Sequence, residues 1–221
     1  MRSFLLPSLL ASGLVAACGT VPEIGLPGRR APEPVVPAVT SETAYAPQLN
    51  QAQLAGRAIT ERRRAALRGD APDASPAAAR ALRAALAEDV LRCTETVEAV
   101  ALEGDELGGP GEGLIAVYLL PVADDPDAVP LGGFHRITVD AASGRVVHRA
   151  AMTETCRDLS LRPAEATPDD ARVRSLFVTH ELTPYPLESH VYTSLTSAVD
   201  LVVTTPTAIW RVSEGRIRAL D

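Results

Sequence analysis

Residues 134–150, FHRITVDAASGRVVHRA, contain the clearest structural signal in the sequence. Apolar and polar residues alternate on both sides of Asp140 to Gly144, a segment rich in turn-forming residues. This pattern is typical of two antiparallel strands joined by a tight turn. The stretch therefore predicts a β-hairpin and favours a sheet for the second half of the chain.

Further short segments with strand character lie on both sides of this hairpin. They are TETVEAVAL (94–102), LIAVYLLPV (114–122), VRSLFVTHEL (173–182), HVYTSLTS (190–197), VDLVVTT (199–205), AIWRV (208–212) and RIRAL (216–220). The Gly-rich segment EGDELGGPGEG (103–113) joins the first two and lacks the GxxxxGK[ST] order of a phosphate-binding loop. We expect an antiparallel sheet of about seven to eight strands.

Two helices are predicted ahead of the strands. The first begins near Asn50 and ends at Gly69, and the second has Ser75 as its cap, Pro76 at its first position and an end near Cys93. The first helix is basic because of Arg62, Arg63, Arg64 and Arg68. These arginines favour contact with anionic lipid or glycan or, more simply, a solvated face paired with nearby acids.

The order of helices followed by strands indicates an α+β fold rather than an α/β fold. We expect one or two N-terminal helices packed on the sheet, as in cystatin-like or NTF2-like architectures. The expected organisation is a signal peptide at 1–17, a lipid-anchored Pro-rich linker at 18–49, a basic helix and connection at 50–74, and an α+β globular domain at 75–221.

The hairpin segment VDAASGRVV (139–147) resembles the Asp-Ala-x-Thr/Ser-Gly-x-Val turn of PepSY-type domains. These domains are small exported α+β modules, often inhibitory or accessory units. The resemblance covers nine residues of 221 and implies the fold class alone.

The first residues have the order of an export signal. Arg2 precedes a mostly apolar segment, Phe4 to Ala17, that is shorter than the roughly 20 residues of a membrane-spanning helix. The following Val15-Ala16-Ala17-Cys18 resembles the bacterial lipobox, which implies cleavage after Ala17 and lipidation of Cys18. The alternatives are an ordinary cleavage site with an incidental cysteine and an uncleaved buried segment. By resemblance to enterobacterial sorting, Gly19 implies an outer-membrane lipoprotein that faces the periplasm.

The composition limits which partners and which redox chemistry are plausible. The formal net charge is −7, which argues against nucleic acid as the main partner. Export would place Cys93 and Cys156 in an oxidising compartment, so we expect a disulfide between them, with two buried free thiols as the alternative. Neither cysteine belongs to a CxxC pair, which makes a redox catalyst a poor explanation.

The most enzyme-like stretch is THELTPYPLESHVY (179–192), which holds His180, Glu181, Glu188 and His190. These are zinc-ligand types, but their spacing is not HExxH, and the two prolines of PYP (184–186) indicate a stiff connection between strands rather than the helix of that motif. We therefore assign these residues to a polar loop and predict no metal site. We likewise predict a solvated turn rather than a calcium site at Asp124, Asp125 and Asp127.

The sequence thus predicts no catalytic residue and no cofactor. Our leading hypothesis is a non-catalytic, lipid-anchored binding or accessory module for another envelope component, with its interaction surface around Trp210, Phe134 and Arg211. Its partners would be the membrane, through Cys18, and an envelope protein. The alternative hypothesis is a metal-dependent envelope hydrolase that uses the segment His180–His190.

Overall fold

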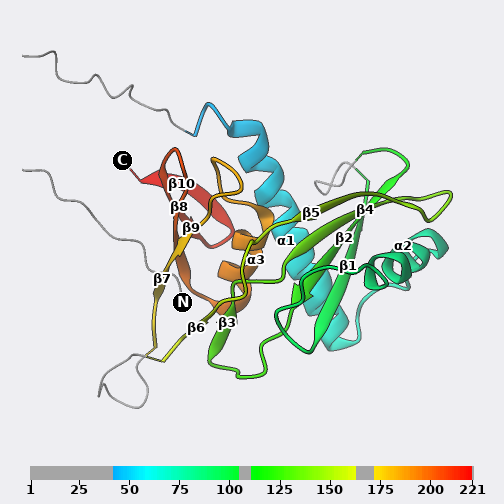
Figure 1. The fold of residues 1–221 in the computed structure, drawn as a ribbon, viewed down its shortest axis with the longest axis horizontal. Helices are drawn as coiled ribbons and strands as arrows, with labels where there is room; N and C mark the ends of the chain where they lie inside the picture. The colour runs from blue at the N-terminus through cyan, green and yellow to red at the C-terminus, as the bar shows by residue number, and fades with distance from the viewer. Residues whose placement is uncertain (1–41, 105–110, 163–171, 221) are drawn as a thin grey trace, which may run out of the picture. The chain divides into compact units, whose positions relative to one another are not determined.

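The computed structural model describes residues 42–104, 111–162 and 172–220, which belong to one compact unit (Figure 1). The helices of this part of the chain are α1 (Ala46–Arg68), α2 (Pro76–Leu86) and α3 (Glu188–Ser197). Its strands are β1 (Val97–Glu103), β2 (Leu114–Pro121), β3 (Ala128–Pro130), β4 (His135–Asp140), β5 (Val146–Ala151), β6 (Asp158–Ser160), β7 (Ser175–Thr179), β8 (Asp200–Thr204), β9 (Ile209–Ser213) and β10 (Arg216–Leu220). None of the described helices is long and apolar enough to cross a membrane.

Sheet A contains four antiparallel strands in the order β1-β2-β4-β5. The predicted hairpin at 134–150 is confirmed as β4 and β5. Its turn is held by Asp140, whose Oδ1 accepts a hydrogen bond from the backbone N–H of Ser143 at 2.7 Å. Gly144 adopts a φ of +71°, a left-handed conformation that favours glycine at this position.

Helices cover both faces of sheet A. On one face, α2 packs three alanines on the sheet in a cluster formed by Ala78, Ala81, Ala85, Ala101, Ile115, Val117, Leu119, Ile137 and Val139. On the other face, α1 contributes to a cluster that includes Ala55, Ala58, Ile59, Val100, Leu102, Ala116, Tyr118 and Leu120. The continuous apolar sequence of β2 follows from this arrangement, because its side chains are buried on both sides.

Sheet C contains four strands in the order β10-β9-β8-β7. The pair β7–β8 is parallel, and α3 makes the crossover between its two strands. The inner face of sheet C buries Leu201, Val203, Trp210 and Val212 in a cluster that also includes Leu49 and Ala52 of α1. A separate antiparallel pair joins β3, which lies between β2 and β4 in the sequence, to β6, which lies between β5 and β7.

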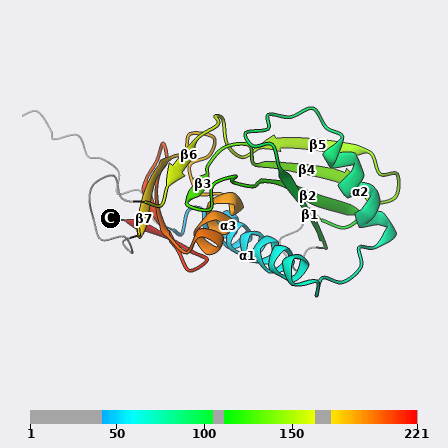
Figure 2. The same ribbon diagram turned by 90° about the horizontal axis from the view of Figure 1, so that it is seen from below.

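Helix α1 therefore contacts both halves of the unit: its first turns pack against sheet C and its middle against sheet A. Figure 2 shows α1 running alongside α3 and on toward sheet A. The two helices approach each other closely at Gly56, where an added Cβ would lie 2.5 Å from the Cβ of Val191. This contact requires glycine in the middle of a helix, where glycine is otherwise unfavourable.

The expected α+β class is confirmed, with helices packed on largely antiparallel sheets. The strands do not form one sheet of seven to eight, however, because the parallel pair β7–β8 begins a second sheet. Helix α1 starts at Ala46 rather than near Asn50, because Pro47 is accommodated in its first turn. The helix belongs to the same compact unit as the strands. Ser75 caps α2 as predicted, through a 3.0 Å bond from the N–H of Ala78, but α2 ends at Leu86 rather than near Cys93.

The segment HVYTSLTS, predicted as a strand, belongs to helix α3. Its β-branched and aromatic residues are typical of strands, and tertiary packing against α1 overrides that preference. Pro184 and Pro186 precede the first helical residue, Glu188, so they leave the helical hydrogen bonds intact.

The basic residues of α1 are largely paired within the unit. Arg63 forms an ion pair with Glu98, Arg68 with Asp70 at 3.0 Å, and Arg64 donates to the backbone oxygen of Leu195 at 2.9 Å. These contacts support the simpler of the two interpretations of this helix, a face paired with local groups.

Candidate functional site

The connection between β7 and α3 brings two histidines together. His180 follows the end of β7 directly, and its backbone N–H donates to the oxygen of Thr204 at 2.8 Å. His190 lies in the first turn of α3. The centroids of the two imidazole rings are 4.8 Å apart, with an angle of 81° between the ring planes. The sequence predicted a polar loop here, and the structure instead folds the segment into a buried aromatic contact.

Hydrogen bonds assign a tautomer to each ring. The hydroxyl of Thr183 donates to the backbone oxygen of Tyr185, so its oxygen accepts from Nε2–H of His180 at 2.8 Å. Nδ1 of His190 accepts from the backbone N–H of Leu187 at 3.0 Å, which leaves the ring proton on Nε2. His180 therefore carries an acceptor at Nδ1 and His190 a donor at Nε2.

Both imidazoles are neutral near neutral pH. Burial, followed by the charge of His180, lowers the pKa of His190 to about 3. Burial also lowers the pKa of His180 from its ordinary value. The pair therefore offers hydrogen-bonding groups without positive charge.

A pocket of about 250 Å³ opens beside these rings. Its lining comes from β7 and the loop after it, from α3, from the segment before β4 and from the segment that follows β5. It includes Phe134, Phe177, His180, Ser189, His190 and Thr193. Ser189 is 5% exposed, and its hydroxyl has no hydrogen-bond partner in the part of the chain that the structure describes. A buried hydroxyl in this state is unfavourable for folding.

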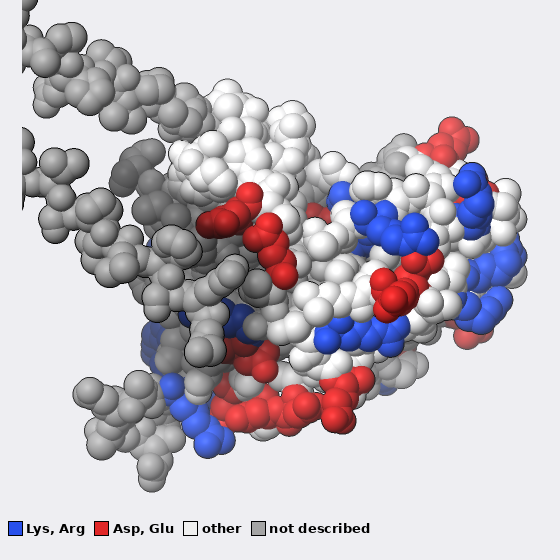
Figure 3. Space-filling model, in the orientation of Figure 1, with Lys and Arg blue, Asp and Glu red and all other residues white. Residues whose placement is uncertain are grey.

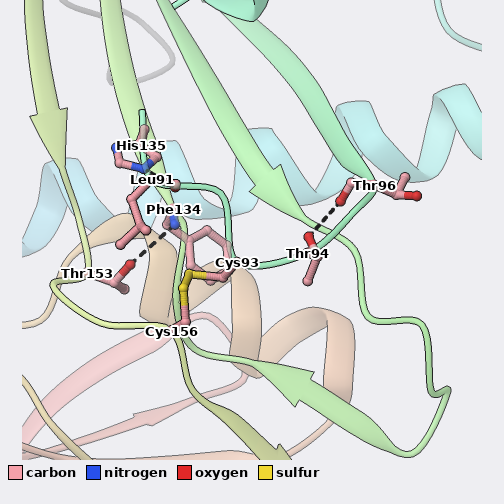
Figure 4. Close-up of a disulfide and its surroundings, with 8 residues drawn as sticks. All are labelled: Leu91, Cys93, Thr94, Thr96, Phe134, His135, Thr153 and Cys156. Atoms are coloured by element: carbon pink, nitrogen blue, oxygen red, sulfur yellow. Dashed lines mark hydrogen bonds between the residues drawn. A yellow bond between two sulfur atoms is a disulfide. The ribbon is translucent and has the colours of Figure 1, made fainter. Parts of the chain in front are cut away.

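The disulfide holds the opposite wall of the pocket. Cys93 and Cys156 are bonded, as predicted, and close a loop with a sequence separation of 63 residues. Cys156 lies within the pocket-lining segment Thr153–Arg157, and the ring of Phe134 lies beside the bridge (Figure 4). The backbone N–H of Phe134 donates to the hydroxyl of Thr153 at 3.3 Å. The disulfide thus fixes one pocket wall to the end of the segment that follows α2.

The two glutamates of this segment are not gathered with the histidines. Glu188 is 4% exposed and accepts hydrogen bonds from Arg136 at 2.8 Å and from the hydroxyl of Tyr118 at 3.2 Å. Burial, followed by the charge of Glu188, raises the pKa of Tyr118. Glu181 is exposed at the rim of the pocket. Among the described residues, no group of three or more His, Cys, Asp or Glu side chains lies close enough to hold a metal ion.

The interaction surface expected around Trp210, Phe134 and Arg211 needs correction. Trp210 is 1% exposed and donates from Nε1 to the hydroxyl of Thr205 at 3.1 Å, while Phe134 is 2% exposed. Both belong to apolar clusters. Strand alternation in β9 places Trp210 on the inner face of sheet C, and Phe134 directly precedes β4. Arg211 lies on the outer face of sheet C and pairs with Asp200 at 2.5 Å. Of these three residues, only Arg211 is exposed.

The remaining two histidines, one on each strand of the β4–β5 hairpin, do not face each other. His135 is buried and lies opposite Ala151, whereas the exposed His148 lies opposite Thr138. Asp127 pairs with Arg162 at 2.5 Å in the acidic turn before β3. Cys18 lies outside the described residues, so its lipidation stays a prediction.

Charges of both signs are interspersed over the right-hand half of the face in Figure 3, which carries β4, β5 and α2. This face shows no extended basic surface of the kind that binds nucleic acid.

Comparison with known proteins gives no relative. No family model, no curated protein and no solved structure matches this chain. The assignment of the site therefore depends on the geometry described above, and the resemblance to PepSY-type domains stays an expectation.

Ser189 and Phe177 were not among the candidates that the sequence pattern indicated. Ser189 lies in the segment that was predicted as loop and strand, so its place at the start of a helix was not foreseen. The only start signal present is Glu188 in the first turn, because the cap position is Leu187 rather than Ser, Thr, Asp or Asn. Phe177 alternates with buried residues in β7, and its exposure follows from the uncovered outer face of sheet C.

Proposed function

We propose that this chain is a non-catalytic, lipid-anchored binding module of the bacterial cell envelope. Cys18 would anchor it in the outer membrane, with the globular unit facing the periplasm and holding a partner protein. Support for the anchor comes from the sequence alone, through the lipobox-like Val15-Ala16-Ala17-Cys18. Two or more acyl chains make a stable anchor where a single chain gives marginal binding.

The observation that carries the binding role is the outer face of sheet C. Phe177 on this face is 75% exposed, and Ile209 and Leu220 are 45% and 43% exposed. Strand register places Phe177 beside Val202, and Ile209 between Thr204 and Leu220. These residues form an apolar surface that we call the outer patch: Phe177, Val202, Ile209 and Leu220. An exposed apolar surface of this kind typically marks a contact with another protein.

The two edges of sheet C differ in a way that favours one docking mode. The edge strand β10 is covered: Gln53 accepts from the N–H of Ile217 at 2.9 Å, and Glu42 from the N–H of Ala219 at 3.2 Å. At the other edge, β7 pairs with β8 on one side, and no further strand pairs with its other side among the described residues. An extended segment of the partner would add to β7 and place its side chains on the outer patch.

Charged side chains border the outer patch. Arg211 pairs with Asp200 at 2.5 Å, and Arg218 pairs with Glu42 at 2.8 Å. An apolar centre with a paired, solvent-exposed polar rim is the usual composition of a protein interface. The rim would orient the partner, and the apolar residues would supply most of the binding energy.

The test is capture of the full-length lipoprotein from detergent-solubilised native membranes after mild crosslinking, followed by mass spectrometry. Ile209→Ser should lose the proteins enriched by the wild-type chain. Leu67→Ser is the matched control, because Leu67 is 66% exposed on α1, away from the outer patch. Cys18→Ala should lose the anchor-dependent partners. Equal capture by wild type and Ile209→Ser would overturn the docking surface.

The alternative, a metal-dependent hydrolase, has one observation in its favour, the contact between His180 and His190. Metal analysis of protein purified without chelator separates the two proposals. Stoichiometric zinc that disappears in His180→Ala would replace the binding module by the hydrolase. Partner capture that persists after chelator treatment would support the binding module.

A further inference from the structure

A second pocket, of about 330 Å³, lies between the start of α1, the end of β5 and the connection from β7 to α3. Arg136 of β4 and Glu188 of α3 both line it, and we call it the Arg136 pocket. Its lining includes no residue of the outer patch and none of β7. We propose that the Arg136 pocket binds a neutral polyol of the size of a single pyranose sugar.

An ion pair supplies the charged groups of this pocket. Nη1 of Arg136 donates to Oε1 of Glu188 at 2.8 Å, and the hydroxyl of Tyr118 donates to the same oxygen at 3.2 Å. The carboxylate is nearly covered, with 5% of its side chain exposed, whereas the side chain of Arg136 is 35% exposed. Glu188 therefore holds the guanidinium in place, and the exposed part of Arg136 offers N–H donors to a ligand.

The other walls of the Arg136 pocket are largely apolar and include Ala52, Ala150, Met152, Tyr185 and Leu187. An aromatic ring beside aliphatic side chains favours a ligand that has an apolar face. A pyranose has such faces, formed by its C–H groups, and carries its hydroxyls around the edge. The volume is near the lower limit of about 300 Å³ for ligand pockets, which suits one ring rather than a longer chain.

Polar side chains reach the pocket from two different elements. Arg136 belongs to β4, and the exposed amide of Gln48 belongs to the first turn of α1. A ligand with a single polar head would meet one of these groups, whereas hydroxyls spread around a ring would reach both. A hydroxyl both donates and accepts, so it is able to pair with a donor-only guanidinium and with an amide.

The charges favour a neutral ligand over an ion. Arg136 and Glu188 are the charged residues of the lining, and they neutralise each other. A ligand carboxylate would have to share Arg136 with Glu188, and a ligand ammonium would compete with Arg136 for the same carboxylate. A hydroxyl avoids both conflicts and still accepts a charge-assisted hydrogen bond, which is roughly twice as strong as one between neutral groups.

The experiment compares neutral and charged sugars of similar shape. Glucose, galactose, mannose, glucuronate and protonated glucosamine are each titrated at pH 6.5 into the isotope-labelled full chain that carries Cys18→Ala, and binding is followed by amide chemical shifts. We expect saturable shifts at Gln48, Ala151 and Tyr185 with at least one neutral sugar, and about tenfold higher dissociation constants for glucuronate and glucosamine. Absence of saturable binding by all three neutral sugars, or equal binding of the charged ones, would overturn the proposal.

Variants locate the contact. Arg136→Lys keeps a cation beside Glu188 and so preserves the fold, but it lacks the forked donors and should raise the dissociation constant about fivefold. Gln48→Ala should raise it about threefold, and Asn50→Ala, exposed on the same helix and outside the lining, is the matched control. Ala151→Trp, at an exposed position of the lining, should block binding. Unchanged binding in both Arg136→Lys and Ala151→Trp would contradict the assignment.

This inference does not depend on the proposed docking surface. Ile209 does not line the Arg136 pocket, so Ile209→Ser should lose partner capture and keep sugar binding. Ala151→Trp should show the opposite combination. Sugar binding by a chain that captures no partner would support the pocket and overturn the docking surface alone. Loss of sugar binding in Ile209→Ser would overturn the assignment of a separate pocket.

Discussion

Gly56 of α1 packs directly against Val191 of α3, so closely that an added Cβ would lie 2.5 Å from the Cβ of Val191 and 2.9 Å from the backbone oxygen of Glu188. This contact fixes α3 against α1 and so fixes the pocket residues that α3 carries. Replacing the glycine should therefore affect both packing and the position of the site.

Gly56→Ala should lower the free energy of unfolding by about 1–3 kcal/mol, because an extra methyl group overfills the contact with Val191. At an exposed helix position alanine is favoured over glycine. The opposite substitution, Ala66→Gly near the end of the same helix, should therefore lower the free energy of unfolding as well, by about 0.5–1 kcal/mol. Urea unfolding of both variants measures the two changes. A Gly56→Ala protein more stable than wild type would show that the helices separate easily.

The pair of Arg136 and Glu188 gives a second prediction. Arg136→Ala should cost about 2 kcal/mol, because it leaves the carboxylate of Glu188 buried without its cation. Arg211→Ala is the control, since its ion pair with Asp200 is exposed and should contribute about 0–1 kcal/mol. Thermal unfolding of the two variants compares them. Equal effects would mean that water reaches Glu188 in solution.

The buried imidazole of His190 predicts a pH dependence of stability. Its pKa is about 3 in the folded chain against an ordinary value of 6.5, so between these values the unfolded chain binds the proton and the folded chain does not. The stabilisation is therefore complete above pH 6.5 and is lost as the pH falls toward 3, with a slope of up to about 1.4 kcal/mol per pH unit. Burial of His180 acts in the same direction.

The variant His190→Gln should reduce this slope and keep the helix start, because glutamine at this position also accepts from the backbone N–H before the helix. His148→Gln, at an exposed position, is the control and should retain the slope of wild type. Unfolding curves at several pH values from 4 to 8 provide the measurement. Parallel pH profiles for wild type and His190→Gln would contradict the assignment to His190.

Ser189→Ala should make the protein more stable by about 1 kcal/mol, because it removes a buried hydroxyl that has no hydrogen-bond partner among the described residues. Thermal unfolding measures the change. A clear loss of stability would show that the hydroxyl makes a hydrogen bond in the native state.

Breaking the disulfide should loosen the pocket wall more than the sheets. The double variant Cys93→Ala/Cys156→Ala should lose about 4 kcal/mol, the loop-closure value for a separation of 63 residues. Hydrogen exchange should increase first in Thr153–Arg157 and in the segment that follows α2. Uniform loss of protection would instead indicate that the bridge supports the whole unit equally.

The sequence predicted local structure well where a pattern involved only residues close to one another in the chain. The hairpin at 134–150, the cap at Ser75 and the disulfide depend on neighbouring residues or on one redox argument, and the structure has all three. The prediction failed for α3, where residues typical of strands are helical. Val191 of this helix packs against Gly56, which lies 135 positions earlier in the chain.

The candidate site shows the same limit. Its two histidines are visible in the sequence, but their contact needs the turn from β7 into α3, and the exposure of Phe177 needs a second sheet with one uncovered face. Trp210 was wrong as a surface residue because strand alternation alone does not say which face is buried. Phe134, just before β4, is buried by its contact with Tyr192 of α3 and by cluster packing. Long-range pairing decides that question.

The hydrogen bond between Glu42 and the backbone of Ala219 joins residues 177 positions apart. Glu42 also pairs with Arg218 of the same strand, and Gln53 of α1 bonds Ile217. Strand β10 is the last of the described elements along the chain, so these bonds form only after every other described element has been synthesised. The attachment of Glu42 and Gln53 to β10 is therefore a late step of folding, although α1 is the first described helix.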